Sequence, residues 1–139
     1  MLAYCLVLLS GCALMSEKIK RMEGVSIAPL EDARGKAAVK TIGYDYFSCY
    51  TKSLDILKKA GAYVYAKDLK KHLIAIYVSE LDTTPVGLFF TEKGKDSTQL
   101  EIASPSGYAR DLISKKVFTE LEKQAKVDKA LNKVSGESR

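Results

Sequence analysis

Few side chains in this sequence have a type and spacing that could direct chemistry, and the clearest case is the thiol of Cys12. The chain contains three cysteines and one histidine. Cys12 follows the apolar residues 1–9 and two small residues, Ser10 and Gly11. A short apolar stretch that ends in small residues is typical of a secretory signal, and it is much shorter than the roughly 20 residues of a membrane-spanning helix. The pattern predicts an exported chain that is cleaved near Cys12.

The sequence Leu9-Ser10-Gly11-Cys12 resembles the lipobox of bacterial lipoproteins. The resemblance implies a signal peptide of residues 1–11, cleavage before Cys12 and diacylation (a palmitate-type lipid anchor) of that cysteine. Two acyl chains anchor a protein stably, since each buried methylene contributes about 0.8 kcal/mol. Ala13, which is not an aspartate, resembles the pattern for export to the outer membrane. The expected location is therefore the bacterial cell envelope, lipid-anchored to the outer membrane and facing the periplasm.

An alternative interpretation is that the first residues form a buried strand or helix that happens to end in Gly-Cys. Residues 1–11 carry no charge, although a signal peptide normally begins with Lys or Arg. The abrupt change to polar and basic residues at 16–22 favours the signal peptide. The chain has a net charge of +5, and a basic surface is suited to anionic lipid headgroups or cell-wall polymers. Nucleic acid is disfavoured as a partner by the exported location.

The other reactive side chains do not form a motif for catalysis. His72 is the single histidine and is expected to be solvated at the start of a strand. Cys49 is expected beside the apolar face of a helix, as a small core residue rather than a nucleophile. Once Cys5 is removed and Cys12 carries lipid, Cys49 is the remaining thiol, so neither an internal disulfide nor a zinc site is predicted. The sequence therefore predicts no catalytic residue, no metal and no cofactor.

The chain is long enough for one domain with a modest core. Residues 12–36 contain charges, Pro29 and two glycines without a sustained period, and we interpret them as a lipidated tether. Residues 37–124 carry the periodic apolar pattern of an α+β domain. Residues 125–139 are rich in lysine and are interpreted as a basic C-terminal tail. The wider lysine-rich stretch 115–133 is expected to be a solvated helix face, with a secondary role on anionic lipid as the alternative.

The domain is predicted to be a two-layer α+β sandwich with the order β-α-β-β-β-β-α. Asp45 is expected to cap a helix that Gly61 ends, and Ser104 is expected to cap a second helix with Pro105 at its first position. Short connections predict an antiparallel sheet of about five strands with the two helices on one face. The expected strands are 37–44, 62–67, 72–79, 86–91 and 97–103.

Alternation along these strands divides the predicted sheet into two faces. The face toward the helices is expected to carry Val64, Ile74, Ile76, Val78, Val86, Leu88, Phe90, Leu100 and Ile102. The opposite face collects four aromatic residues, which are the candidate partner-binding residues: Tyr63, Tyr65, Tyr77 and Phe89. A contiguous exposed apolar patch usually marks an interaction site. The alternatives are that these residues are strong strand formers, or that the tether or the tail lies over them.

Several segments between Tyr44 and Phe118 resemble the small domain of bacterial lipoproteins of an uncharacterised family. They are the helix at 50–60, the strands at 73–78 and 86–91, and Ser104-Pro105-Ser106 leading toward Lys116-Val117-Phe118. The resemblance implies a strand-helix-strands-helix domain on a lipid tether, and it implies no activity. The leading hypothesis is a non-enzymatic envelope protein that binds a protein partner or itself through the aromatic sheet face. The alternatives are a carrier or sensor of a small apolar ligand in the periplasm and, third, an envelope hydrolase.

Overall fold

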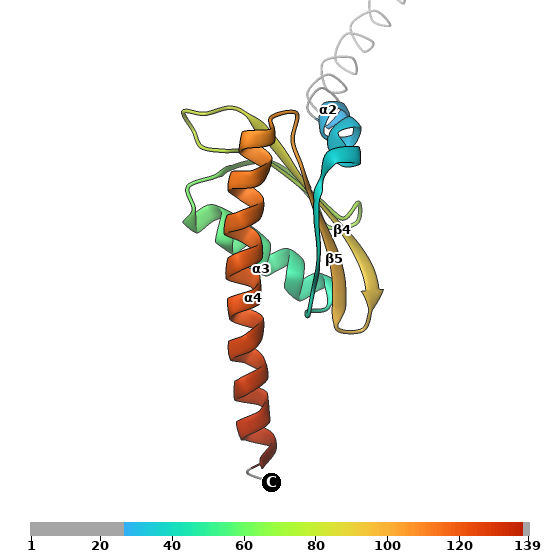
Figure 1. The fold of residues 1–139 in the computed structure, drawn as a ribbon, viewed down its shortest axis with the longest axis vertical. Coiled ribbons are helices and arrows are strands. Elements are labelled where there is room, and N and C mark those ends of the chain that lie inside the picture. Colours follow the sequence, from blue (N-terminus) through green and yellow to red (C-terminus); the bar gives the residue numbers. More distant parts are fainter. Residues whose placement is uncertain (1–26, 138–139) are drawn as a thin grey trace, which may run out of the picture.

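The fold is built around an antiparallel five-stranded sheet with the strand order β1-β5-β4-β3-β2 (Figure 1). A computed structural model describes residues 27–137, so the predicted signal peptide 1–11, Cys12 and most of the predicted tether lie outside the described residues. The α+β class and the predicted element order are confirmed, with one short helix, α2, added before them. The elements are α2 (Ala28–Asp32), η1 (Ala33–Lys36), β1 (Ala38–Ile42), α3 (Tyr46–Lys59), β2 (Tyr63–Asp68), β3 (Leu73–Tyr77), β4 (Pro85–Gly94), β5 (Ser97–Ala103) and α4 (Gly107–Glu137).

Strands β2 to β5 form an antiparallel meander, because each short connection returns the chain beside the strand it has just left. Strand β1 closes the other side of the sheet by pairing with β5, with Ala38 opposite Ile102 and Ile42 opposite Thr98. Strands β1 and β2 are therefore the two edges. The chain reaches β2 from β1 through α3, which crosses one face of the sheet.

Helix α3 has the ends that the sequence predicts. The Asp45 carboxylate accepts a hydrogen bond from the backbone N–H of Ser48 at 3.1 Å, which satisfies one of the donors left free in the first turn. Hydrogen bonding from Ser48, first through its side chain and then through its backbone N–H, lowers the pKa of Asp45. At the other end Gly61 has a φ of +83°, a left-handed conformation that glycine adopts without a steric penalty.

Helix α4 begins two residues later than predicted. The hydroxyl of Ser106 accepts a hydrogen bond from the N–H of Ala109 at 3.2 Å and is the N-terminal cap. The predicted cap, Ser104, instead donates its hydroxyl to the carbonyl of Pro85 at 2.7 Å. Because this bond ties Ser104 to the neighbouring strand, the helix starts only after Pro105. α4 then runs without interruption to Glu137, through most of the segment interpreted as a separate tail.

The main core lies between the sheet and the helices α3 and α4. All nine strand residues predicted for this face belong to it, seven of them buried and Val64 and Val78 partly buried at its margin. From α3 the core receives Cys49, Tyr50, Ile56 and Leu57, and from α4 it receives Ala109, Ile113, Val117 and Leu121. The helices of residues 27–137 lack the combination of length and apolar character that crossing a membrane requires.

The end of the predicted tether is folded. Residues 28–36 form α2 and the 3-10 turn η1, and they pack on the sheet face that α3 and α4 leave uncovered. Figure 1 shows α2 at one end of the sheet and the C-terminal part of α4 projecting past the opposite end. The boundary between tether and domain therefore lies earlier than the predicted residue 36, because Leu30 is fully buried in the structure.

Candidate partner-binding surface

The outer face of the sheet, away from α3 and α4, contains a row of small residues that accommodates α2. Ala75 of β3, Gly87 of β4 and Ala103 of β5 stand opposite one another in the strand register. Leu30 of α2 fits over this row and is fully buried. A Cβ at Gly87 would lie 3.2 Å from Leu30 and 2.9 Å from the ring of Phe89. The absence of a side chain at Gly87 is therefore what lets α2 approach the sheet.

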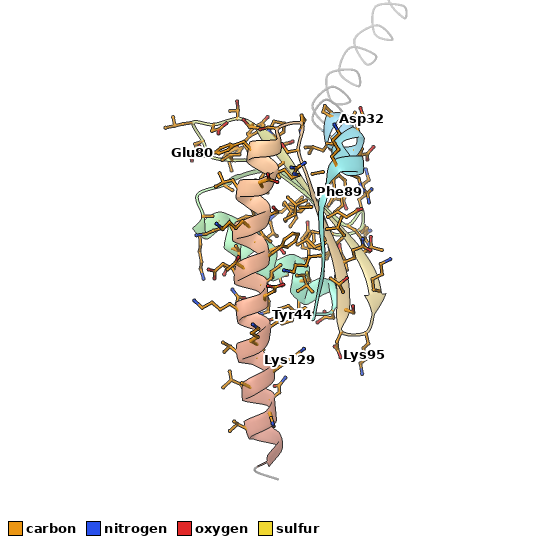
Figure 2. The ribbon with its side chains drawn as sticks, viewed as in Figure 1. Asp32, Tyr44, Glu80, Phe89, Lys95 and Lys129 are labelled. Atoms are coloured by element: carbon orange, nitrogen blue, oxygen red, sulfur yellow. The ribbon has the colours of Figure 1, made fainter. Side chains whose placement is uncertain are left out.

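Phe89 lies beside this row, and α2 and η1 cover it. Its exposed fraction is 6%, and the guanidinium of Arg34 lies 4.3 Å from the centre of its ring, a cation–π contact. The carboxylate of Glu101, on β5, accepts hydrogen bonds from Nε and Nη2 of Arg34 and holds that side chain in place. The prediction that Phe89 is part of an exposed aromatic patch is wrong, because the supposed tether folds over it (Figure 2).

The other three predicted aromatics do gather into one stack. Tyr63 and Tyr77 face each other across β2 and β3, with ring centres 6.1 Å apart and ring planes 12° from parallel. Tyr65 lies on the other side of Tyr77, with centres 4.3 Å apart and an interplanar angle of 28°. Tyr63 is 49% exposed, and Tyr65 and Tyr77 are half-buried. We refer to Tyr63, Tyr65 and Tyr77 as the tyrosine surface.

A β-bulge interrupts β2 at Tyr65. The pairing of β2 with β3 shifts between Val64 and Ala66, so that Tyr65 is an extra residue in the ladder. Regular alternation would give Tyr65 and Ala66 opposite faces of the sheet, but both pack on the outer apolar cluster. The bulge therefore adds Ala66 to the outer face beside Tyr65 and reverses the alternation of the rest of β2 as far as Asp68. Sequence alternation alone does not reveal it.

The residues with reactive side chains lie elsewhere and are not assembled with one another. The thiol of Cys49 is fully buried in the main core, and burial raises its pKa to about 12, so it is protonated at neutral pH. His72 precedes β3 with a φ of +58°, and its ring stacks on Tyr46 with centres 4.1 Å apart. Within residues 27–137 no group of three or more His, Cys, Asp or Glu side chains is placed to hold a metal ion.

An apolar hollow near the helices is a groove between α4, the end of α3 and the end of β3. Its volume is about 480 Å³. Ala60, Val78 and Ile113 contribute apolar lining, and the exposed residues Leu112 and Lys116 lie at its margin. It is therefore a surface groove, and the main core between the sheet and the helices is filled by its own side chains.

Sequence reasoning missed Leu30 and Arg34, the residues that cover the outer face. The signals for them were weak: Pro29 in the first turn of a helix, and the small residues Ala75, Gly87 and Ala103 at outward positions of three strands. No protein-family model matches this chain, and no curated protein matches its sequence.

Proposed function

We propose that this protein is a non-enzymatic, lipid-anchored protein of the bacterial envelope that binds a protein partner through the tyrosine surface. The observation that carries the proposal is the stack of Tyr63, Tyr65 and Tyr77 on the part of the outer sheet face that α2 leaves open. The occupant is a different envelope protein or a second copy of this chain, and the experiment below separates the two.

The chemistry of the tyrosine surface is suited to protein recognition. Tyrosine is enriched among the residues that contribute most to protein interfaces, because its ring buries a large area and its hydroxyl forms hydrogen bonds. Here the rings are held by two paired strands and by contact with one another. A partner would therefore immobilise few side chains, each of which otherwise costs about 0.5–1.5 kcal/mol on binding.

The outer face also offers a partner two different neighbours beside the tyrosines. On one side lies the apolar region covered by α2, and on the other lies the outer edge of β2, the strand that carries Tyr63 and Tyr65. The exposed fraction of Tyr63 is the largest of the three, so we expect it to lie at the centre of the contact.

The membrane attachment in the proposal comes from the sequence Leu9-Ser10-Gly11-Cys12. The described domain begins at residue 27, and a chain reaches at most about 3.3–3.6 Å per residue. The fifteen residues from 12 to 27 therefore allow the domain to lie up to about 50 Å from the lipid, or directly against it.

The binding proposal is tested by placing a photo-crosslinking amino acid at position 63 in the full-length protein in cells. The matched control is the same amino acid at position 108, because Tyr108 is a 75% exposed tyrosine outside the tyrosine surface. We expect one discrete crosslinked product from position 63, which Tyr77→Ala weakens at least fivefold, and none from position 108. A product of twice the mass of the chain identifies a second copy as the partner. Equal products from both positions would show that the tyrosine surface is not a specific site.

The anchor is tested separately with Cys12→Ser. Acylation predicts that the wild-type chain begins at residue 12 with added lipid mass and sediments with membranes, and that the substitution abolishes the lipid mass. An unmodified wild-type thiol on a chain that retains residues 1–11 would disprove the anchor, whatever the outcome of the crosslinking.

The groove beside α4 supports the second candidate, a carrier or sensor of a small apolar ligand. Its volume of about 480 Å³ lies within the range of small-molecule sites. Ala60→Phe would fill it from the end of α3. If this substitution abolishes the binding of a fluorescent apolar probe, while Tyr63→Ala leaves it unchanged, the carrier function is favoured over the protein-binding function.

A further inference from the structure

Helix α4 has an outward face that is strongly basic. Lys116, Lys123, Lys126 and Lys133 are separated by seven, three and seven residues, which places them on one side of an α-helix. Val117 and Leu121, which are fully buried, belong to the opposite side. We refer to these four lysines as the lysine face. From Lys116 to Lys133 it extends over about 26 Å at 1.5 Å per residue.

Two acidic residues that lie among these lysines in the sequence, Glu122 and Asp128, do not neutralise this face, because they are engaged on the side of the helix toward the domain. Glu122 forms an ion pair with Lys40 of β1. Asp128 lies 3.6 Å from the ammonium of Lys52 on α3 and accepts a hydrogen bond from the hydroxyl of Tyr44. Among residues 27–137, no lysine of the lysine face takes part in an ion pair.

An apolar flank runs beside the lysine face in the C-terminal part of α4. Val127, Leu131 and Val134, spaced by four and three residues, share one flank of the helix, and their exposed fractions are 52%, 62% and 67%. Figure 2 shows α4 continuing past Lys129 with no other described element beside it. The projecting part of α4 thus combines exposed cationic and apolar side chains on adjacent sides.

The presence of both exposed lysines and exposed apolar side chains on α4 favours one of three possible binding partners over the others. A hydrophilic polyanion would neutralise the lysines but could not bury Leu131 or Val134. A second copy, docked through the same helix face, would bring two sets of lysines together, and like charges repel. An anionic membrane surface satisfies both features, because basic amphipathic helices lie in the headgroup region with their apolar residues toward the acyl chains.

We infer that the lysine face and its apolar flank bind the surface of a membrane that contains anionic phospholipids, with α4 parallel to the membrane plane. This contact does not require acylation of Cys12. In that orientation the helix layer lies against the membrane, and the tyrosine surface, on the opposite side of the sheet, faces away from it. The proposed protein partner would then approach from the side opposite the lipid.

The inference is tested with the full-length Cys12→Ser chain, in which acylation cannot contribute, and vesicles of phosphatidylglycerol and phosphatidylcholine. We expect binding to the anionic vesicles that weakens as salt is raised, because exposed charges are screened within about 10 Å at 0.1 M salt. Replacement of Lys123, Lys126 and Lys133 by Glu should weaken binding at least tenfold. The matched control replaces Lys70, Lys93 and Lys95, three exposed lysines outside α4, by Glu and should stay within threefold of the parent.

A fluorescence measurement tests the orientation of the helix. The chain has no tryptophan, so a single introduced one is an unambiguous reporter. Leu131→Trp should show a blue-shifted emission on adding anionic vesicles. Leu81→Trp should not, because Leu81, which is 99% exposed, lies in the loop between β3 and β4, next to Glu80 and at the opposite end of the molecule from the part of α4 beyond Lys129 (Figure 2). Circular dichroism of each variant establishes that the fold is intact before binding is compared.

Three results would overturn the inference. The first is equal loss of binding in the α4 triple variant and its control. The second is a blue shift at position 81 that equals the shift at 131. The third is tight binding of soluble polyphosphate with no binding to anionic vesicles, which would assign the lysine face to a hydrophilic polyanion. None of these results depends on whether Cys12 is acylated or whether the tyrosine surface has a partner.

Discussion

The two faces of the sheet are built from the same alternating strands, but they are covered in different ways. On the inner face α3 and α4 bury an apolar core that extends across all five strands. On the outer face α2 and η1 cover a smaller cluster around Leu30 and Phe89, and the tyrosine surface remains open beside it. One face is closed by 14- and 31-residue helices, and the other in part by nine residues.

The comparison shows how a small domain can separate stability from recognition. Hydrophobic stabilisation grows with the apolar area removed from water, so the inner face supplies most of it. The outer cover is held by fewer contacts: Leu30 with smaller apolar neighbours such as Ile27 and Ala33, the cation–π contact and ion pair of Arg34, and a hydrogen bond from Arg110 to the carbonyl of Lys36. Regions with few buried contacts open at lower free energy than the core, and binding surfaces are often drawn from such regions.

The largest loss of stability is expected from a substitution that leaves a cavity in the apolar core of the inner face. Leu88 is fully buried in the central strand β4, and Leu88→Ala should lower the free energy of unfolding by about 3–4 kcal/mol. The measurement is urea denaturation followed by circular dichroism. Val39→Ala on the edge strand β1, where Val39 is 51% exposed, should cost less than about 0.5 kcal/mol. A similar loss in both variants would mean that the inner face is not the main source of stability.

An intermediate loss of stability is expected from substitutions that weaken the packing of α2 on the outer face. Leu30→Ala should lower the free energy of unfolding by about 2 kcal/mol, at the low end for a buried leucine because α2 can move into the space. Gly87→Ala should act in the same direction by pushing α2 outward. Both variants should be cut by trypsin after Arg34 and Lys36 faster than the wild type. Unchanged cleavage would show that α2 is held by contacts other than those around Leu30.

A smaller effect is expected from the pH dependence of Cys49. Burial raises the pKa of its thiol to about 12 from an ordinary value of 9.0, so above pH 9 only the unfolded state loses the proton. Stability is therefore lost as pH rises, by about 1 kcal/mol between pH 9 and pH 10. Urea denaturation should show this loss in the wild type in addition to any loss seen in Cys49→Ala. Parallel pH profiles for the two proteins would mean that the thiol is accessible in the folded state.

The smallest effect on stability is expected on the tyrosine surface. Tyr63 is half exposed at the edge of the sheet, and Tyr63→Ala should cost about 0.5 kcal/mol or less. Together with the expected loss of crosslinking, this result would separate a binding residue from a structural one. A loss above about 2 kcal/mol would instead assign Tyr63 to the scaffold.

The parts of the fold that sequence reasoning predicted are those determined by local pattern. Asp45, Gly61 and the alternation of strands β3 to β5 identified the first helix and the inner face, because caps, turns and periodicity depend on neighbours along the chain. The cap of α4 was assigned to Ser104 rather than Ser106, since nothing in the local sequence indicates that the Ser104 hydroxyl binds the carbonyl of Pro85 on a distant strand.

The candidate site was predicted in part. Alternation predicts that Tyr63, Tyr65 and Tyr77 lie together, but it does not predict the bulge at Tyr65. Phe89 was expected to be open with them, and Arg34 and Leu30 cover it instead. This contact joins residues more than fifty positions apart, and a short charged segment with Pro29 carries little local signal for it.

The sequence by itself determined the class of the fold, the inner apolar face and the lysine-rich composition of the last helix, because these follow from the order and period of residue types. Only the tertiary structure decided which side chains of the outer face remain exposed and where Glu122 and Asp128 of α4 find their partners. Both depend on the packing of distant segments against each other. Burial and ion pairing are properties of three-dimensional neighbours, and a residue's neighbours along the chain do not specify them.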